Sequence, residues 1–282
     1  MTARALRHAW RLLPRELWWG VALLLPIVLL AMFASVLFGA RPLSIVADPY
    51  LWPGTDPAHW LGTDTMGRDM LTGIAHGARI SLLIGLTATA LALGLGVSIG
   101  VLSGYAGGAL DAVLSRLIEL FQTMPSMLVA IVVVVVFEPS LMSIAVAIGL
   151  ASWTDVARIV RAETLRVKQL EFVQAARLSG FGPARILLRE VLPNVLGPVS
   201  VLASIIVAHA ILAEAAIAFL GLGDPNTVSW GGMVGAGREA LRSGWYISTI
   251  PGIAICLTAF SISLIGNGLN HLLSPRTARS VP

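Results

Sequence analysis

The chain has 282 residues, of which 56% are hydrophobic and only 12% are charged. Soluble globular proteins carry roughly 25% charged residues, so this composition excludes an ordinary soluble domain. The net charge of +4 comes from arginines next to apolar stretches, which indicates orientation in a membrane rather than binding to nucleic acid. Uncharged stretches of 24, 31 and 33 residues (17–40, 80–110 and 243–275) each exceed the roughly 20 residues that a membrane-spanning helix needs. The sequence therefore predicts an all-α protein that crosses a membrane several times.

We predict one transmembrane domain over residues 17–272, between an amphipathic cytoplasmic helix at residues 1–16 and a cytoplasmic tail at residues 273–282. Four arginines lie on one face of the N-terminal helix and apolar side chains on the other, as in helices that lie on a membrane surface. The apolar run that follows is too long for a signal-peptide core and lacks a cleavage site of small residues. A retained first span is therefore predicted.

Six membrane-spanning helices are predicted from the apolar runs. They cover residues 17–39, 80–104, 113–137, 141–153, 195–222 and 245–271. The second contains four small residues that suit close helix packing, namely Gly94, Gly96, Gly100 and Gly104. The fourth is short and charged residues follow it, so we expect it to continue as a helix beyond the bilayer.

Basic residues in the connections predict how these helices are oriented. With both termini on one side, that side holds 14 of the 19 basic residues and the other side holds 5. Both termini are therefore predicted to be cytoplasmic. The longest external connection is then residues 41–79, and the longest cytoplasmic one is residues 155–194. Trp230 and Trp245 are predicted to anchor the bundle at the membrane interface.

Motifs of catalysis are missing from the sequence. The only lysine, Lys168, stands between Val167 and Gln169, which excludes a phosphate-binding loop of the usual sequence. No zinc-protease or serine-hydrolase motif occurs, and the five histidines lie in different segments. The single cysteine, Cys256, has no partner for a disulfide or a metal site. We therefore predict that this chain is not an enzyme and has no catalytic residue, no metal site and no bound cofactor.

The longest cytoplasmic connection is too polar for lipid and has the pattern of two short helices. The first is predicted at residues 170–179, and Gly180 ends it in a left-handed conformation. Pro183 is placed to open the second helix, at residues 185–192. Small residues in the first helix would let another protein approach closely. Two interpretations stay open: a docking surface for a partner, and a basic loop whose charges only set the topology.

Three separated stretches resemble the permease subunits of ATP-binding-cassette importers. The cytoplasmic stretch resembles their "EAA" loop through Gln174, Ala175, Ala176, Gly180, Leu192 and Pro193, with Phe181 and Pro183 in the turn. Residues 59–69 and 77–82 resemble the external start of the C-type subunit in the dipeptide/oligopeptide/nickel permease family. Residues 219–223 and 229–231 resemble that family's segment after the fifth span. Two positions depart from the pattern, because the family usually has Glu at position 174 and commonly has His where this chain has Glu190.

The resemblance implies a permease subunit of a bacterial importer for dipeptides or oligopeptides, embedded in the lipid of the inner membrane. The partners it implies are a second, homologous permease, two ATPase subunits that bind ATP and magnesium, and an external substrate-binding protein. Residues 170–190 would then form a coupling helix pair seated in a cleft of an ATPase subunit. Nickel chelates and glutathione stay open as alternative substrates within the same family.

The roles of polar residues in the fifth span and in the external connection each have two interpretations. Glu214 lies in the fifth span, where it is expected to line the translocation path or to make a hydrogen bond between helices at the subunit interface. His209 stands five residues earlier and is expected to be structural, with a place on the translocation path or the subunit interface as the alternative. Asp64, Arg68 and Asp69 in the external connection are expected either to contact the binding protein or to pair locally and hold the loop over the gate.

Two other classes of protein share part of this pattern. A secondary transporter or channel would also have six spans and a carboxylate in the membrane, but no ion-coordinating set or inverted repeat is apparent in the sequence. A membrane-embedded enzyme would need a nucleophile or a metal cluster, and neither is apparent. Dependence of transport on ATP distinguishes the importer from the first class, and turnover by the isolated chain would identify the second.

Overall fold

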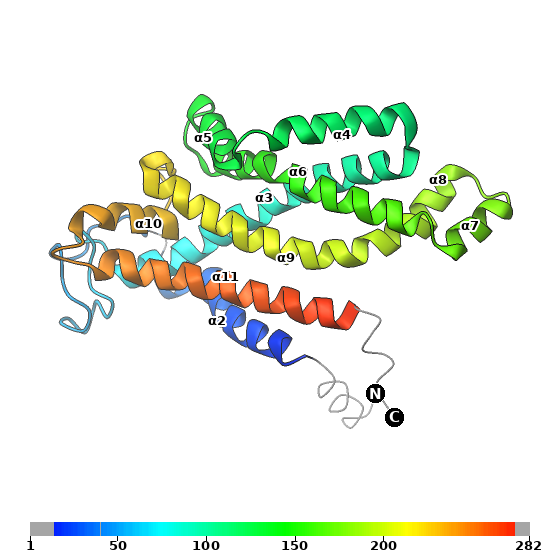
Figure 1. The fold of residues 1–282 in the computed structure, drawn as a ribbon. Coiled ribbons are helices and arrows are strands. Elements are labelled where there is room, and N and C mark those ends of the chain that lie inside the picture. The colour runs from blue at the N-terminus through cyan, green and yellow to red at the C-terminus, as the bar shows by residue number, and fades with distance from the viewer. Residues whose placement is uncertain (1–13, 40, 274–282) are drawn as a thin grey trace, which may run out of the picture.

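The computed structural model describes residues 14–39 and 41–273 (Figure 1). Over these residues the chain is helical and forms no strand, with two isolated antiparallel bridges in the loop at residues 41–69. The predicted all-α class is therefore confirmed. The N-terminal helix predicted at residues 1–16 lies outside the described residues except for residues 14–16. The tail predicted at residues 273–282 lies outside them except for residue 273.

Five long helices form the body of the molecule. They are α2 (Arg15–Leu37), α3 (Met70–Ala106), α6 (Leu141–Val167), α9 (Leu192–Ile217) and α11 (Tyr246–Leu273). Helices α3, α6, α9 and α11 pack side by side, and α2 packs on α11 and α3 (Figure 1). Each of the five is long and apolar enough to cross a membrane. Helices α4 (Gly108–Gln122) and α5 (Ser126–Val136) bring the number of spans to six when they count as one.

The third span is not the single straight helix that was predicted at residues 113–137. Helices α4 and α5 meet at a bend of 82°. Pro125, in the break, has no backbone N–H to donate and disfavours helical conformation at Met124 before it. Residues 120–137, on both sides of the break, carry no charge, so the absence of charged residues did not reveal it.

The second span begins at Met70, ten residues before the predicted start at Ile80. Asp69 caps the helix, because its carboxylate accepts a hydrogen bond from the Thr72 amide at 2.7 Å. A cap of this kind satisfies one of the free N–H groups at a helix N-terminus and sets where the helix starts. The predicted loop at residues 41–79 is therefore shorter, and its last ten residues belong to α3.

Close packing between α3 and α6 depends on three of the four glycines predicted for this purpose. A Cβ atom added at Gly100 would lie 2.6 Å from the Ala157 carbonyl oxygen, and one at Gly104 would lie 2.8 Å from the Thr164 Cβ atom. Gly96 lies equally close to α6, against Val156. Gly94 is different, since nothing lies within 4 Å of a Cβ atom placed there. The prediction is therefore wrong for Gly94.

Helix α6 continues to Val167, as expected for the fourth span, and the chain then forms α7 (Glu171–Leu178) and α8 (Pro183–Ile186). The separate second helix predicted at residues 185–192 is wrong. Helix α8 passes through a π-helical turn (Leu187–Val191) into α9, so that one helix runs from Pro183 until Gly221, whose φ of +85° breaks it. Pro193 lies inside this helix, directly after the π-helical turn, where the regular α-helical hydrogen bonding is already interrupted.

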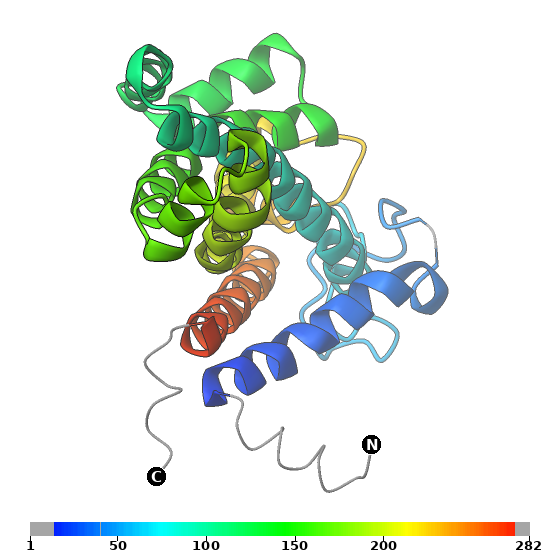
Figure 2. The same ribbon diagram turned by 90° about the vertical axis from the view of Figure 1, so that its right-hand side faces the viewer.

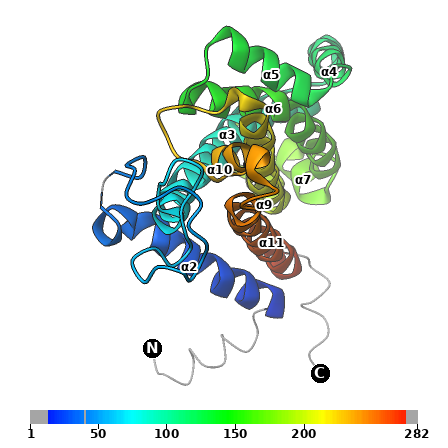
Figure 3. The same cartoon turned by 90° about the vertical axis from the view of Figure 1, so that its left-hand side faces the viewer.

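The two ends of the bundle differ. Helices α7 and α8 project at one end, which Figure 2 shows facing the viewer. The 41–69 loop and α10 (Trp230–Gly237) lie at the opposite end, which faces the viewer in Figure 3. A π-helical turn, η2 (Ala218–Leu222), and a 3₁₀ turn, η3 (Arg238–Ala240), border α10 at this end.

Candidate functional site

The turn between α7 and α8 has the geometry that the sequence predicts. Gly180 adopts a φ of +76°, and its amide donates to the Arg177 carbonyl oxygen at 3.0 Å. The next amide, of Phe181, donates to the Ala176 carbonyl oxygen at 3.2 Å. Pro183 then stands in the first turn of α8. The guanidinium of Arg185 lies 4.1 Å from the centre of the Phe181 ring, a stacking contact that holds the two sides of the turn together.

One face of this segment packs on its own bundle. Val173, Ala176, Ile186 and Val191 are buried in a single apolar cluster with residues of α3 and α6 such as Val160. Ala176 therefore faces inward, and the expectation that it lets a partner approach is wrong. The other predicted residues of the turn are exposed, namely Gln174, Ala175, Gly180, Phe181 and Pro183. Leu192 is half-buried and Pro193 exposed in the first turn of α9.

The opposite face carries exposed apolar side chains that sequence reasoning missed. Leu178 is 90% exposed, and Phe172 earlier on α7 and Leu188 in the π-helical turn after α8 are 40% and 60% exposed. These side chains lie at the end of the bundle that the charge distribution predicts to be cytoplasmic, where lipid does not cover them. Exposed apolar side chains that lipid does not cover are available to contact a partner protein. Their presence in an otherwise polar connection was the available signal.

Side-chain hydrogen bonds tie both ends of this segment to α3. The Lys168 ammonium donates to the carbonyl oxygens of Gly104 and Tyr105 at 3.1 and 3.0 Å, at the C-terminal end of α3. The Tyr105 hydroxyl donates in turn to the Pro183 carbonyl oxygen at 2.9 Å. The side-chain amide of Gln174 donates to the Lys168 carbonyl oxygen at 3.2 Å. We call this set of hydrogen bonds the clasp.

The clasp gives a physical reason for one departure from the family pattern. The Gln174 side chain acts as a donor toward a carbonyl oxygen. An ionised glutamate has only acceptor atoms and could not make this bond. Glutamine at position 174 therefore adds a contact within the chain.

Glu214 lies inside the bundle, between α9, α3 and the start of α10. Its residue is 1% exposed, and the Ser81 hydroxyl donates to its carboxyl group at 3.3 Å. The Ser81 oxygen also accepts from the Trp230 amide at 3.2 Å. Of the two interpretations for Glu214, the hydrogen bond between helices is present, but within this chain and not across a subunit interface. His209, also on α9, is exposed on the outside of the chain.

Trp230 is not an interfacial anchor, which corrects the prediction from sequence. It is 1% exposed, and its indole N–H donates to the Ile74 carbonyl oxygen in α3 at 2.9 Å. Trp245 is 53% exposed and packs edge-to-face on Trp52. A buried tryptophan needs a partner for its N–H, and here a helix 156 positions away supplies it.

The contacts of Glu214 predict different outcomes for two substitutions. Glu214→Gln keeps an oxygen that accepts from Ser81, so we expect wild-type stability and transport. Glu214→Leu removes that acceptor from a buried site, so we expect a loss of about 1–3 kcal/mol in the free energy of unfolding. Thermal unfolding of the purified protein and solute uptake by the assembled transporter measure both effects. A Glu214→Gln variant that folds normally and does not transport would contradict the structural role and assign the charge to the path.

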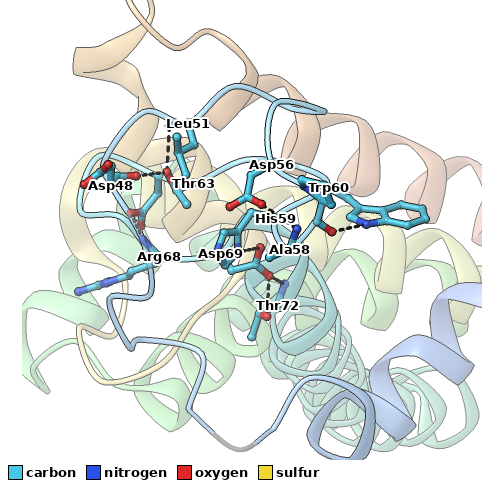
Figure 4. A network of polar contacts seen from close by, with 12 residues as sticks. Asp48, Leu51, Asp56, Ala58, His59, Trp60, Thr63, Arg68, Asp69 and Thr72 are labelled. Atoms are coloured by element: carbon cyan, nitrogen blue, oxygen red, sulfur yellow. Dashed lines mark hydrogen bonds and ion pairs between the residues drawn. The ribbon is translucent and has the colours of Figure 1, made fainter.

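Asp64 and Asp69 act locally within the 41–69 loop, and Figure 4 shows Asp69 beside His59 and Thr72. One Asp64 oxygen accepts from the amides of Met66 and Arg68 at 2.7 and 2.9 Å. Asp69 caps α3, and its other oxygen lies 3.3 Å from His59 Nδ1. The side chain of Arg68 forms an ion pair with neither carboxylate, and it extends away from Asp69 (Figure 4). The local pairing that was expected thus occurs for the two aspartates and not for Arg68.

Five apolar helices, or six spans when the bent α4–α5 pair counts as one, carry an exposed helix–turn–helix at one end and a capped loop at the other, an arrangement that fits a membrane transport subunit. The chain belongs to the family described as the binding-protein-dependent transport system inner membrane component, which matches residues 96–279. The resemblance that the three sequence stretches indicated is therefore confirmed.

The chain is similar to several named permeases over most of its length. It is 38% identical to the oligopeptide transport system permease protein OppC of Escherichia coli (strain K12), over 91% of this chain and 87% of that protein. It is 35% identical to the di/tripeptide transport system permease protein DppC of Pseudomonas aeruginosa (strain UCBPP-PA14), with the same two coverages. It is also 35% identical to the dipeptide transport system permease protein DppC of Bacillus subtilis (strain 168), over 97% of this chain and 86% of that protein.

The fold is similar to a chain of the inward-facing MetNI methionine ABC transporter. The TM-score is 0.61 at 16% sequence identity, and the alignment covers 73% of this chain and 98% of that chain. At this identity the likeness concerns the fold alone. It confirms the predicted permease fold of ATP-binding-cassette importers.

Proposed function

We propose that this chain is one of two permease subunits in an ATP-driven importer of short peptides. The observation that carries the proposal is the exposed apolar face of α7 and the turn after it, joined to the bundle by the clasp. The names of the similar permeases, which describe oligopeptide and di/tripeptide transport, support a peptide as the substrate. A nickel chelate or glutathione is the alternative substrate class.

The partners follow from the same proposal. A homologous permease completes the translocation path, and two separate ATPase subunits bind ATP and magnesium, since this chain has no phosphate-binding loop. An external binding protein delivers the peptide at the end that carries the 41–69 loop. Both termini and the α7–α8 segment lie in the cytoplasm, and the complex resides in the bacterial inner membrane.

The geometry supports a mechanism in which motion of the ATPase moves long helices as levers. A subunit seated on Phe172, Leu178 and Leu188 would pull on α7 and α8 together. Helix α8 is continuous with α9, so its displacement reaches the opposite end of the bundle. The clasp and the shared apolar cluster make α3 and α6 follow. ATP favours one state only if the ATPase contacts this segment differently in the inward-facing and outward-facing states.

Breaking the clasp is expected to weaken coupling more than stability. Tyr105→Phe removes one hydrogen bond, worth about 0.5–1.5 kcal/mol, and Lys168→Met removes two from a charged donor. We expect peptide uptake per ATP hydrolysed to fall about twofold to tenfold, with more loss for Lys168→Met. Parallel assays of ATP hydrolysis and uptake in proteoliposomes measure this ratio.

Tyr50→Phe is the matched control, since it removes a tyrosine hydroxyl at the opposite end of the bundle and is expected to leave the ratio unchanged. An unchanged ratio in both clasp variants would contradict the lever mechanism.

The experiment that tests the proposed function is reconstitution of the complete importer in vesicles. Uptake of a labelled dipeptide should require ATP, the binding protein and both permeases, and should stop when either ATPase subunit is omitted. Competition with a nickel chelate or glutathione distinguishes the alternative substrates. Uptake that follows an ion gradient without ATP would instead identify a secondary transporter.

A further inference from the structure

A cavity of about 530 Å³ opens at the end of the bundle that carries the 41–69 loop. Most of its wall comes from the 41–69 loop, η2 with the segment that follows it, and α10 with Arg238 and Glu239, and residues of α3 and α11 complete it. Figure 3 shows these parts together at that end of the molecule. Sites for small organic ligands typically have volumes of roughly 300–1,000 Å³. The cavity is therefore large enough for a short peptide.

Arg68 lines this cavity and has no ionic partner in the described part of the chain. Its Nε atom is buried and makes no hydrogen bond with residues 14–39 or 41–273. The side chain extends away from the His59–Asp69 pair (Figure 4). Buried donors are normally satisfied, because a buried donor without an acceptor is costly. The position and charge of Arg68 thus suit an anionic acceptor that a ligand brings.

Four carboxylates also line the cavity, and backbone amides occupy three of them. Asp64 accepts from the amides of Met66 and Arg68, Asp69 accepts from Thr72, and Asp224 accepts from Leu141 and Asn226. Glu239 differs, because its side chain is 85% exposed and lies 3.8 Å from its nearest cation, Arg238. Arg238 in turn donates to the Phe219 carbonyl oxygen. Within the described residues, the cavity therefore presents an unpaired cation at Arg68 and a weakly paired carboxylate at Glu239.

Resting on the proposed function, we propose that Arg68 binds the C-terminal carboxylate of a short peptide in this cavity before the peptide enters the path. A guanidinium is planar and matches a carboxylate with two parallel hydrogen bonds. The positively charged N-terminal ammonium of the peptide would be attracted to the Glu239 carboxylate. An acidic side chain of the external binding protein has the same carboxylate chemistry, so the experiment must separate these two sources.

The test measures binding of dialanine and of dialanine amide to the permease–ATPase complex in lipid nanodiscs, without the binding protein. We expect wild-type complex to bind dialanine about ten to one hundred times more tightly than the amide, as loss of a charged hydrogen-bonding partner predicts. Arg68→Gln should weaken dialanine binding by a similar factor and abolish the preference. Arg68→Lys keeps the charge without the planar fork and should give an intermediate affinity.

The matched control is Arg242→Gln. It removes the same charge from an exposed position on the same side of the predicted membrane, outside the cavity wall, and should leave binding unchanged. Equal binding of dialanine and its amide by wild type, or equal dialanine binding by wild type and Arg68→Gln, would overturn the proposal.

A second measurement identifies the source of the carboxylate. Docking of the peptide-free binding protein to the same complex should be unaffected by Arg68→Gln. A loss of docking without any change in dialanine binding would overturn the peptide as the source and assign the carboxylate to the binding protein. ATP-driven uptake by the wild-type importer is measured alongside. If the wild-type importer takes up peptide and Arg68→Gln changes neither binding nor uptake, only the carboxylate site is rejected. If the wild-type importer shows no ATP-driven uptake, the proposed function is rejected.

Discussion

Replacing Gly100 with leucine is expected to destabilise the bundle strongly. A Cβ atom at this position would lie 2.6 Å from the Ala157 carbonyl oxygen and 2.9 Å from the Val160 Cβ atom. Because the first of these atoms is backbone, a side-chain rotation cannot relieve the clash, and α3 and α6 must move apart. Overpacking of a well-packed core typically costs about 1–3 kcal/mol, and we expect at least the upper value here. The measurement is the yield of monodisperse protein in detergent and its thermal unfolding.

Gly94→Leu is the matched control for Gly100→Leu. It introduces the same side chain into the same helix, at a position where nothing lies within 4 Å of the added Cβ atom. We expect wild-type yield and thermal stability for this variant. Equal stability of Gly94→Leu and Gly100→Leu would show that the glycines of α3 do not set the packing against α6.

Replacing Gly180 with proline is expected to abolish transport while the protein still inserts and folds. Gly180 has a φ of +76°, and its amide donates to Arg177. Proline is fixed near a φ of −65° and has no N–H, so it can adopt neither feature. The turn must rearrange, and the exposed apolar face of α7 loses its relation to α8. We expect peptide uptake to fall by at least about tenfold, while thermal unfolding of the transmembrane bundle changes little.

Gly182→Ala serves as the control for this turn. Gly182 has a φ of −66°, which any residue adopts, and open space surrounds it. Alanine at this position is expected to transport like wild type. Uptake that stays at the wild-type level in Gly180→Pro would count against a role of the turn in coupling.

Much of the fold could be predicted from the sequence because membrane thickness constrains it. Uncharged runs of sufficient length identified the spans, and Gly180 with Pro183 identified the turn between α7 and α8. The start of α3 could not be read from hydropathy. Arg79 interrupts the apolar run, whereas the helix itself begins at the cap that Asp69 provides.

The surroundings of the candidate site depended on contacts between distant parts of the chain. Ser81 and Glu214 are 133 positions apart, and Tyr105 and Pro183 are 78 apart. No local pattern reports such pairs, so the sequence left the role of Glu214 open and gave no sign of the clasp. Ala176 faces inward because of the orientation of α7 about its own axis against the bundle. The sequence spacing between Ala176 and Gly180 did not determine that orientation.

Cross-linking from Leu178 tests whether the exposed face of α7 docks on an ATPase subunit, as we propose. This side chain is 90% exposed at the end of the helix. A photoreactive amino acid at position 178, activated in native membranes, should yield one adduct between this chain and the ATPase subunit. The same amino acid at Val136, exposed at the end of α5, is the control and should not yield that adduct. If neither position forms an adduct with the ATPase while the complex still transports peptide, α7 does not dock on the ATPase and the proposed coupling is wrong.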